Sequence, residues 1–166
     1  EITRICSFLK NISQISCVTF TSYVLNNLGH MYSFGSNMYN LLGSPNIFND
    51  SRFNKLKCDN KIIYMDCGYA HTCFITDKYE LYSFGFNQSN QCGTPNKDTN
   101  QIPLPTKLKF DKNIINIKCG RNHNIITTDN NELYSYGGNH LKQCLLKCND
   151  EIITKPTLIS IQSIKN

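Results

Sequence analysis

The sequence predicts an all-β fold made of repeated units, and two observations carry this prediction. A segment recurs at residues 17–43, 67–93 and 119–145, and in each copy a Tyr follows the leading Cys by 15 positions. Short apolar runs separated by turn-forming residues recur inside every copy. A period of about 50 residues with strand-like content indicates a propeller, a solenoid or another array of repeats.

Each repeat is predicted to begin with a strand that ends at the leading Cys. Two apolar residues three positions apart precede this Cys in every copy: Ile12 and Ile15, Ile62 and Met65, Ile114 and Ile117. A run of six residues that contains Ile, Tyr and Cys and is bounded by a turn fits a strand buried on both faces. Residues 2–17 are predicted to form two such short strands around a turn at Lys10-Asn11.

A Gly-x-x-His segment follows the leading strand and is predicted to form a tight turn. The Gly and His are Gly68 and His71 in the second repeat and Gly120 and His123 in the third. We expect Gly to supply the unusual backbone angles of this turn. Because both His recur at one repeat position, we expect each to hold its turn by a hydrogen bond rather than to catalyse or bind metal.

Two further strands complete the recognisable part of each repeat. Residues 72–76 and 124–128 are predicted strands, and residues 77–80 and 129–132 are the turns that follow them. The next strand carries a Tyr-Ser-aromatic-Gly box at 32–35, 82–85 and 134–137. Small residues on one face would let a neighbouring sheet approach closely, while aromatic side chains from the next unit fill the gap.

Polar Gly-x-Asn loops and variable, Pro-containing stretches end the copies. Residues 155–158 match residues 104–107, so another strand is predicted there. We therefore predict one domain with three repeats, at residues 12–61, 62–113 and 114–166. Since both ends of the chain fall at a repeat junction, we expect it to be an excerpt of a longer protein.

The nine cysteines are interpreted as structural thiols in a reducing compartment. The sequence has no Cys-x-x-Cys pair, and the closest pair, Cys144 and Cys148, has no matching second pair. We therefore expect no metal and no disulfide, and an intracellular location, cytoplasmic or nuclear. Cys17, Cys67 and Cys119 are expected to be buried.

Charge and motifs exclude several classes of function. The net charge is +5, but the 17 Lys and Arg are scattered, so nucleic-acid binding is possible but not indicated. No apolar stretch is long enough to span a membrane, and no secretory leader is visible. Nucleophile elbows, phosphate-binding Gly loops and His-Glu-x-x-His are absent. We expect no enzyme activity and no cofactor.

The repeat pattern, with its leading Cys-Gly-x-x-His and its Tyr-Ser-aromatic-Gly box, resembles the regulator of chromosome condensation repeat. Residues 67–93 match best, 119–145 slightly less well, and 17–43 mainly in the second half. The resemblance implies a β-propeller with one four-stranded antiparallel blade per repeat, hence three blades. Rings of this family usually have about seven blades, so the resemblance also implies that other blades complete the ring.

The resemblance implies three kinds of function. The first is a non-catalytic protein-interaction propeller; the alternatives are an exchange factor for a Ran-type small GTPase and a propeller associated with chromatin or RNA. In the exchange factors, the residues that face the GTPase lie mainly between the Gly and the His. The matching residues here are Thr19, Phe20, Tyr69, Ala70, Arg121 and Asn122. None is acidic, whereas the exchange factors have acidic groups in several of these turns.

Five of these turn residues are the candidate binding residues: Phe20, Tyr69, Ala70, Arg121 and Asn122. Variable residues on fixed turns can carry specificity, and Phe, Tyr and Arg suit binding hot spots. We expect Phe20, Tyr69 and Arg121 to lie exposed on one face, where another protein, a small GTPase among the candidates, would dock. Alternatively, the two aromatic residues cover the core.

Overall fold

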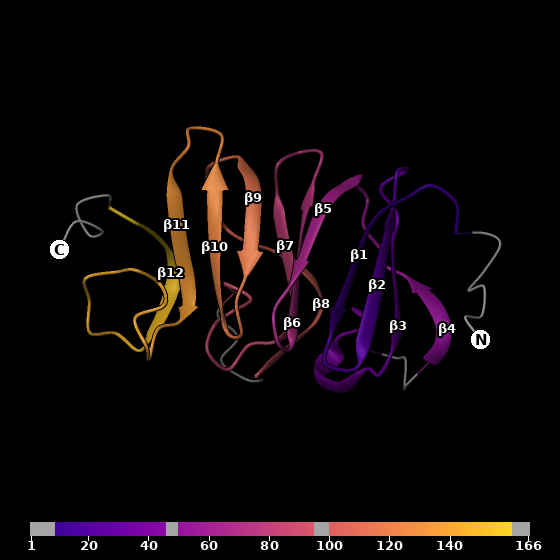
Figure 1. Ribbon diagram of the computed structural model, residues 1–166, viewed down its shortest axis with the longest axis horizontal. Helices are drawn as coiled ribbons and strands as arrows, with labels where there is room; N and C mark the ends of the chain where they lie inside the picture. Colours follow the sequence, from indigo (N-terminus) through magenta and orange to yellow (C-terminus); the bar gives the residue numbers. More distant parts are fainter. Residues whose placement is uncertain (1–8, 46–49, 95–99, 161–166) are drawn as a thin grey trace.

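A computed structural model describes residues 9–45, 50–94 and 100–160, and it consists of three four-stranded antiparallel sheets (Figure 1). In each sheet the strands pair in the order in which they occur along the chain. This confirms the predicted propeller blades. The helical content of the described residues is one short 3₁₀ turn, η1 (Met38–Asn40). No helix among them is long and apolar enough to cross a membrane.

The three blades correspond to the three repeats. Blade 1 contains β1 (Ile12–Val18), β2 (Thr21–Asn26), β3 (Met31–Gly35) and β4 (Asp50–Lys55). Blade 2 contains β5 (Ile62–Cys67), β6 (His71–Thr76), β7 (Leu81–Phe86) and β8 (Gln101–Lys107). Blade 3 contains β9 (Ile114–Cys119), β10 (His123–Thr128), β11 (Leu133–Gly138) and β12 (Ile152–Leu158).

The blades stand in a row, with blade 2 between blades 1 and 3 (Figure 1). Their leading strands lie next to one another, since β1 contacts β5 and β5 contacts β9. β1 confirms the second of the two short strands predicted in residues 2–17. The first of those strands falls mainly on residues 2–8, which lie outside the described residues.

The leading strands are not buried on both faces, so that prediction is wrong. Ile62 and Met65 are buried on β5, but Ile63 between them is exposed, and on β1 Ile15 is 76% exposed. The spacing of three comes from a β-bulge: the pairing of β5 with β6 shifts between Ile62 and Tyr64. A bulge adds one residue to a strand, so residues three apart can point to the same side.

Aromatic side chains of the Tyr-Ser-aromatic-Gly box fill the space between blades, as predicted. Phe84 of blade 2 is fully buried and meets Tyr23 of blade 1 edge-on, with 6.3 Å between ring centroids. A Cβ on Gly43 of blade 1 would lie 3.2 Å from the Phe84 ring. Tyr136 of blade 3 packs in the same way beneath Gly93 of blade 2. Gly at these loop positions therefore makes room for the aromatic ring of the next blade.

The Ser of the box fixes the loop that follows its own strand. Its hydroxyl donates to a loop carbonyl in every blade: Ser33 to Leu42 at 2.9 Å, Ser83 to Cys92 at 2.6 Å and Ser135 to Cys144 at 2.6 Å. The Gly-x-Asn side chain accepts from the backbone of the same loop, for example Asn87 Oδ1 from Cys92 N at 2.8 Å. These buried hydrogen bonds keep the loops against the inter-blade core.

The final Gly of the box is the residue that needs a left-handed backbone. Gly35, Gly85 and Gly137 have φ values of 112°, 109° and 105°. A Cβ on Gly85 would also lie 2.7 Å from the carbonyl oxygen of Ala70, in the turn between β5 and β6. This Gly thus lets the third strand of a blade lie directly against the turn between its first two strands.

Candidate interaction surface

The turns between the first and second strands of the three blades lie side by side. We call residues 18–21, 68–71 and 120–123 the turn row. The Thr19 hydroxyl donates to the carbonyl oxygen of Tyr69 at 2.8 Å, and the Tyr69 N–H donates to the carbonyl oxygen of Arg121 at 3.2 Å. The turns of blades 1 and 2, and those of blades 2 and 3, are therefore hydrogen-bonded to each other.

The turn row carries exposed side chains that were predicted from the sequence. Phe20 is 61% exposed, Tyr69 is 49% exposed, and Arg121 is also exposed. The Arg121 guanidinium lies over the Tyr69 ring, 5.1 Å from its centroid. Such a contact between a cation and an aromatic face is attractive and holds both groups in place. The exposure of these three residues is confirmed, and the aromatic pair does not simply cover the core.

The other two candidate residues are less accessible. Ala70 is only 1% exposed, so its methyl group cannot form part of a docking surface, and the interpretation of its side chain as a contact residue needs correction. Its carbonyl oxygen accepts from Phe86 N at 2.7 Å. Asn122 is half-buried, and its carbonyl oxygen accepts from Gly138 N, also at 2.7 Å. These backbone hydrogen bonds tie each turn to the third strand of its own blade.

Gly68 is required for a different reason from the predicted one. Neither Gly68 nor Gly120 has a φ in the left-handed region, so neither supplies unusual backbone angles. A Cβ on Gly68 would lie 2.1 Å from His71 Cε1 and 2.5 Å from the carbonyl oxygen of Gly120. The imidazole ring and the neighbouring turn occupy the space that a side chain would need.

His71 joins blade 2 to blade 3. Its ring is fully buried, and Nε2 lies 2.9 Å from Asn124 Oδ1 on β10. Asn124 Nδ2 donates to the carbonyl oxygen of Gln91 at 2.6 Å, so Oδ1 is the acceptor and His71 Nε2 the donor. Burial lowers the pKa of His71 to about 4, so the ring is neutral at physiological pH. The predicted hydrogen bond is confirmed, but it crosses blades instead of closing the turn.

His123 does not repeat this arrangement. Its ring is half-buried, burial lowers its pKa, and no hydrogen-bond partner for it exists among the described residues. The acceptor for His71 comes from the following blade, and residues 9–45, 50–94 and 100–160 include no sheet in that position beyond blade 3. The prediction that the His123 side chain holds its turn by a hydrogen bond is therefore wrong for this part of the chain; the turn is closed by the backbone, from Gly120 N–H to the His123 carbonyl oxygen at 2.8 Å.

The leading cysteines differ in exposure. Cys17 is exposed, so the prediction of burial is wrong for it. Cys67 and Cys119 are half-buried, and burial raises the pKa of the Cys67 thiol to about 12 and that of Cys119 well above its ordinary value. Cys67 lies on β5, which contacts β1, and Cys119 lies on β9, which contacts β5, whereas the described residues include no blade before blade 1. The cysteines among the described residues are free thiols.

We expect thiol labelling to distinguish these positions. In the native protein Cys17 should react with an alkylating reagent, whereas Cys73, Cys92 and Cys144 are buried and should react only after unfolding. Peptide mapping after a short exposure to the reagent, with and without denaturant, measures the reaction at each position. Native labelling of Cys73 as fast as that of Cys17 would contradict the packing of blades 2 and 3.

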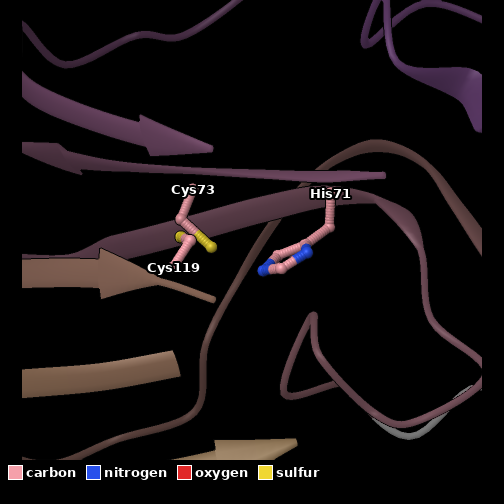
Figure 2. A group of neighbouring side chains, drawn as sticks. All are labelled: His71, Cys73 and Cys119. Carbon is pink, nitrogen blue, oxygen red and sulfur yellow. The ribbon is translucent and has the colours of Figure 1, made fainter. Parts of the chain in front are cut away.

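One cluster of potential metal ligands was not found from the sequence. The side chains of His71, Cys73 and Cys119 converge, and their ligand atoms all lie within 4.8 Å of one another (Figure 2). The repeat pattern gives no signal at Cys73, because Tyr23 and Ile125 occupy its position in the other repeats. The sequence feature that indicates this cluster is the pair His71 and Cys73, because residues two apart on a strand point to the same face.

Comparison with known proteins identifies the repeat. A model of the regulator of chromosome condensation (RCC1) repeat matches residues 29–75 and 80–126, and a second model of this repeat matches residues 114–143. An RCC1 repeat-containing protein of Dictyostelium discoideum is 35% identical over 154 residues, which cover 80% of this chain and 30% of that protein. The chain thus spans about a third of the length of this relative and of protein pim1 of Schizosaccharomyces pombe.

Solved structures agree with the blade architecture. Human WBSCR16 superimposes with a TM-score of 0.80 at 24% identity, over 90% of this chain and 39% of that one. Saccharomyces cerevisiae Prp20p superimposes with a TM-score of 0.81 at 20% identity, over 92% of this chain and 39% of that one. At these identities the similarity establishes the fold.

Proposed function

Because the chain belongs to the family of regulator of chromosome condensation (RCC1) repeat proteins, we propose that it is a non-catalytic propeller that binds another protein through its turn row. The observation that carries the proposal is the pair of hydrogen bonds from Thr19 to Tyr69 and from Tyr69 to Arg121. They join three turns into one surface without using the exposed side chains of Phe20, Tyr69 and Arg121.

The composition of the turn row supports a protein partner. Tyr, Phe and Arg are enriched at protein interfaces, and Tyr and Arg are frequent hot-spot residues. The Tyr69 ring and the Arg121 guanidinium already contact each other, so little side-chain freedom is lost when a partner covers them. Asn122 follows Arg121 in the same turn and is half-buried, so its amide is partly accessible to a partner.

Alanine substitution in the turn row tests the proposal. Tyr69→Ala or Arg121→Ala should weaken partner binding by about 1–3 kcal/mol while leaving the fold intact, because both side chains are exposed. The full chain is used to isolate partners from a native extract, and the affinity of the strongest is then measured for purified variants by calorimetry. Circular dichroism melting of each variant reports the fold.

Tyr79 provides a matched control. It is an exposed Tyr in the turn between β6 and β7, at the other end of β6 from His71. Tyr79→Ala should leave partner binding unchanged. An equal loss of affinity in Tyr79→Ala, or a loss of melting temperature in step with the loss of binding in Tyr69→Ala, would contradict docking at the turn row.

Nucleotide exchange on a Ran-type small GTPase is the second candidate. It is suggested by the fold shared with Prp20p, whose structure was described together with its binding properties to Gsp1p and histones. The turn positions 19, 20, 69, 70, 121 and 122 carry no acidic residue, which argues against exchange by these three blades. We expect no acceleration of labelled GDP release from a purified Ran-type GTPase; clear acceleration would favour the exchange factor.

Association with chromatin or RNA is the third candidate, and salt distinguishes it. Binding through Lys and Arg to a phosphate backbone falls steeply as salt rises.

We expect an intracellular protein, cytoplasmic or nuclear, because the described cysteines are free thiols, as is usual in reducing compartments. We also infer that further blades complete the ring, since the chain spans only 39% of the solved propellers that it matches.

A further inference from the structure

The junction between blades 2 and 3 brings together nitrogen and sulfur ligands from two blades. His71 and Cys73 are fully buried on β6, and Cys119 is the last residue of β9. Figure 2 shows one ring nitrogen of His71 directed toward the two thiols. The alternation of side chains along β6 places His71 and Cys73 on the same face, and the contact of β6 with β9 adds Cys119.

Asn124 supplies a fourth donor atom. Its Oδ1 lies 2.9 Å from His71 Nε2 and 3.9 Å from Cys73 Sγ. Its Nδ2 donates to the carbonyl oxygen of Gln91 at 2.6 Å, and this hydrogen bond keeps Oδ1 turned toward the cluster. The Asn124 amide oxygen therefore lies beside two members of the cluster, the His71 imidazole and the Cys73 thiol.

Two buried polar atoms at this junction lack a hydrogen-bond partner. His71 Nδ1 and the Tyr136 hydroxyl are buried and have no hydrogen-bond partner. Tyr136 belongs to the same buried core cluster as Cys73, and Cys119 packs against that cluster. Buried polar groups in proteins are normally paired, so this junction contains more polar groups than its hydrogen bonds use.

We propose that His71 Nε2, Cys73 Sγ, Cys119 Sγ and Asn124 Oδ1 form a four-coordinate structural zinc site that links blade 2 to blade 3. Two thiolates and an imidazole are ligands that zinc and Cu(I) both accept. Charge decides between the two ions. Zn²⁺ with two thiolates and a neutral imidazole has no net charge, whereas Cu(I) with the same ligands is an anion, which a buried site disfavours.

Binding is accompanied by a defined movement of protons. Each thiol loses its proton to solvent when its sulfur binds Zn²⁺, so two protons leave per zinc. The proton on His71 Nε2 passes to Nδ1, and the ring remains neutral. Gly68 lies against this ring, and the absence of a Cβ there lets the imidazole keep its position.

The test uses the full chain, stripped of metal, unfolded and refolded with one equivalent of Zn²⁺ under reducing conditions. We expect one zinc per chain after gel filtration and two protons released per zinc. X-ray absorption at the zinc edge should show two sulfur atoms at about 2.3 Å together with two lighter atoms. Protein that keeps no zinc, or a zinc shell with four sulfurs or none, would overturn the site.

Two variants locate the metal, and a third is the matched control. Cys73→Ser and Cys119→Ser should each weaken zinc binding about tenfold or more, because each removes a ligand. Cys144→Ser removes another buried thiol, one whose Sγ contacts the carbonyl oxygen of Gly138 at 3.5 Å, and should bind zinc like the unmodified chain. Full affinity in both ligand variants would show that zinc binds elsewhere. If a variant does not fold, the absorption spectrum of the unmodified chain still decides.

Discussion

Replacing Phe84 by Ala should lower the free energy of unfolding by about 3–5 kcal/mol, the usual loss when a buried Phe is truncated in a core. The ring is fully buried between blades 1 and 2, where it contacts Tyr23 and lies beneath Gly43. The substitution leaves a cavity between two rigid sheets, which cannot easily move together to fill it. Chemical denaturation of the two proteins under the same conditions gives the difference.

Phe34 is the matched control, because it occupies the same position of the repeat in blade 1. It is only half-buried and packs against Phe53 of its own blade, with 4.7 Å between ring centroids. Phe34→Ala should therefore lower the free energy of unfolding by only about 1 kcal/mol. Equal losses for the two substitutions would mean that packing between blades contributes no more to stability than packing within a blade.

Gly68→Ala should lower the free energy of unfolding by about 3 kcal/mol, because overpacking adds to the loss of a buried hydrogen bond. The new methyl group would overlap the buried His71 ring and the carbonyl oxygen of Gly120 in the next turn. To remove this overlap, the His71 ring would have to break its hydrogen bond with Asn124, or the two turns would have to move apart. Denaturation curves measure the loss.

Gly120→Ala serves as the comparison at the same position of blade 3. There the three atoms nearest to the added methyl group all belong to the ring of His123, which is half-buried and not the fully buried ring that His71 has. The loss should be about 1 kcal/mol or less. A loss for Gly120→Ala as large as that for Gly68→Ala would show that the backbone of the turn, and not the contact between blades, requires Gly.

The repeated features of the fold could be predicted from the sequence. The three Tyr-Ser-aromatic-Gly boxes recur at one spacing from the leading Cys, and the structure places them in the third strand of three equivalent blades. A fixed spacing predicts structure because residues at the same position of each repeat occupy the same position in each blade. Exposure of Phe20, Tyr69 and Arg121 followed from the same reasoning.

Features that depend on a neighbouring blade could not be predicted in this way. Cys17 and Cys67 occupy the same position of the repeat. The strand of Cys67 has a neighbouring leading strand, β1, before it, whereas the strand of Cys17 has none among the described residues, so Cys17 is exposed and Cys67 is half-buried. The bulge after Ile62 leaves no mark in the sequence beyond a spacing of three. Cys73 lacks a counterpart in either other repeat, and its partner Cys119 belongs to another blade.

The hydrogen bond between the turns of blades 2 and 3 runs from backbone to backbone, from Tyr69 N–H to the Arg121 carbonyl. Residues other than Pro at position 69 keep this donor, and any residue at position 121 keeps the acceptor. Substitutions at the two positions can therefore change the chemistry of the surface without moving the scaffold beneath it. The same three blades can therefore present different side chains on one fixed backbone, much as antibody loops are diversified on an unchanging framework.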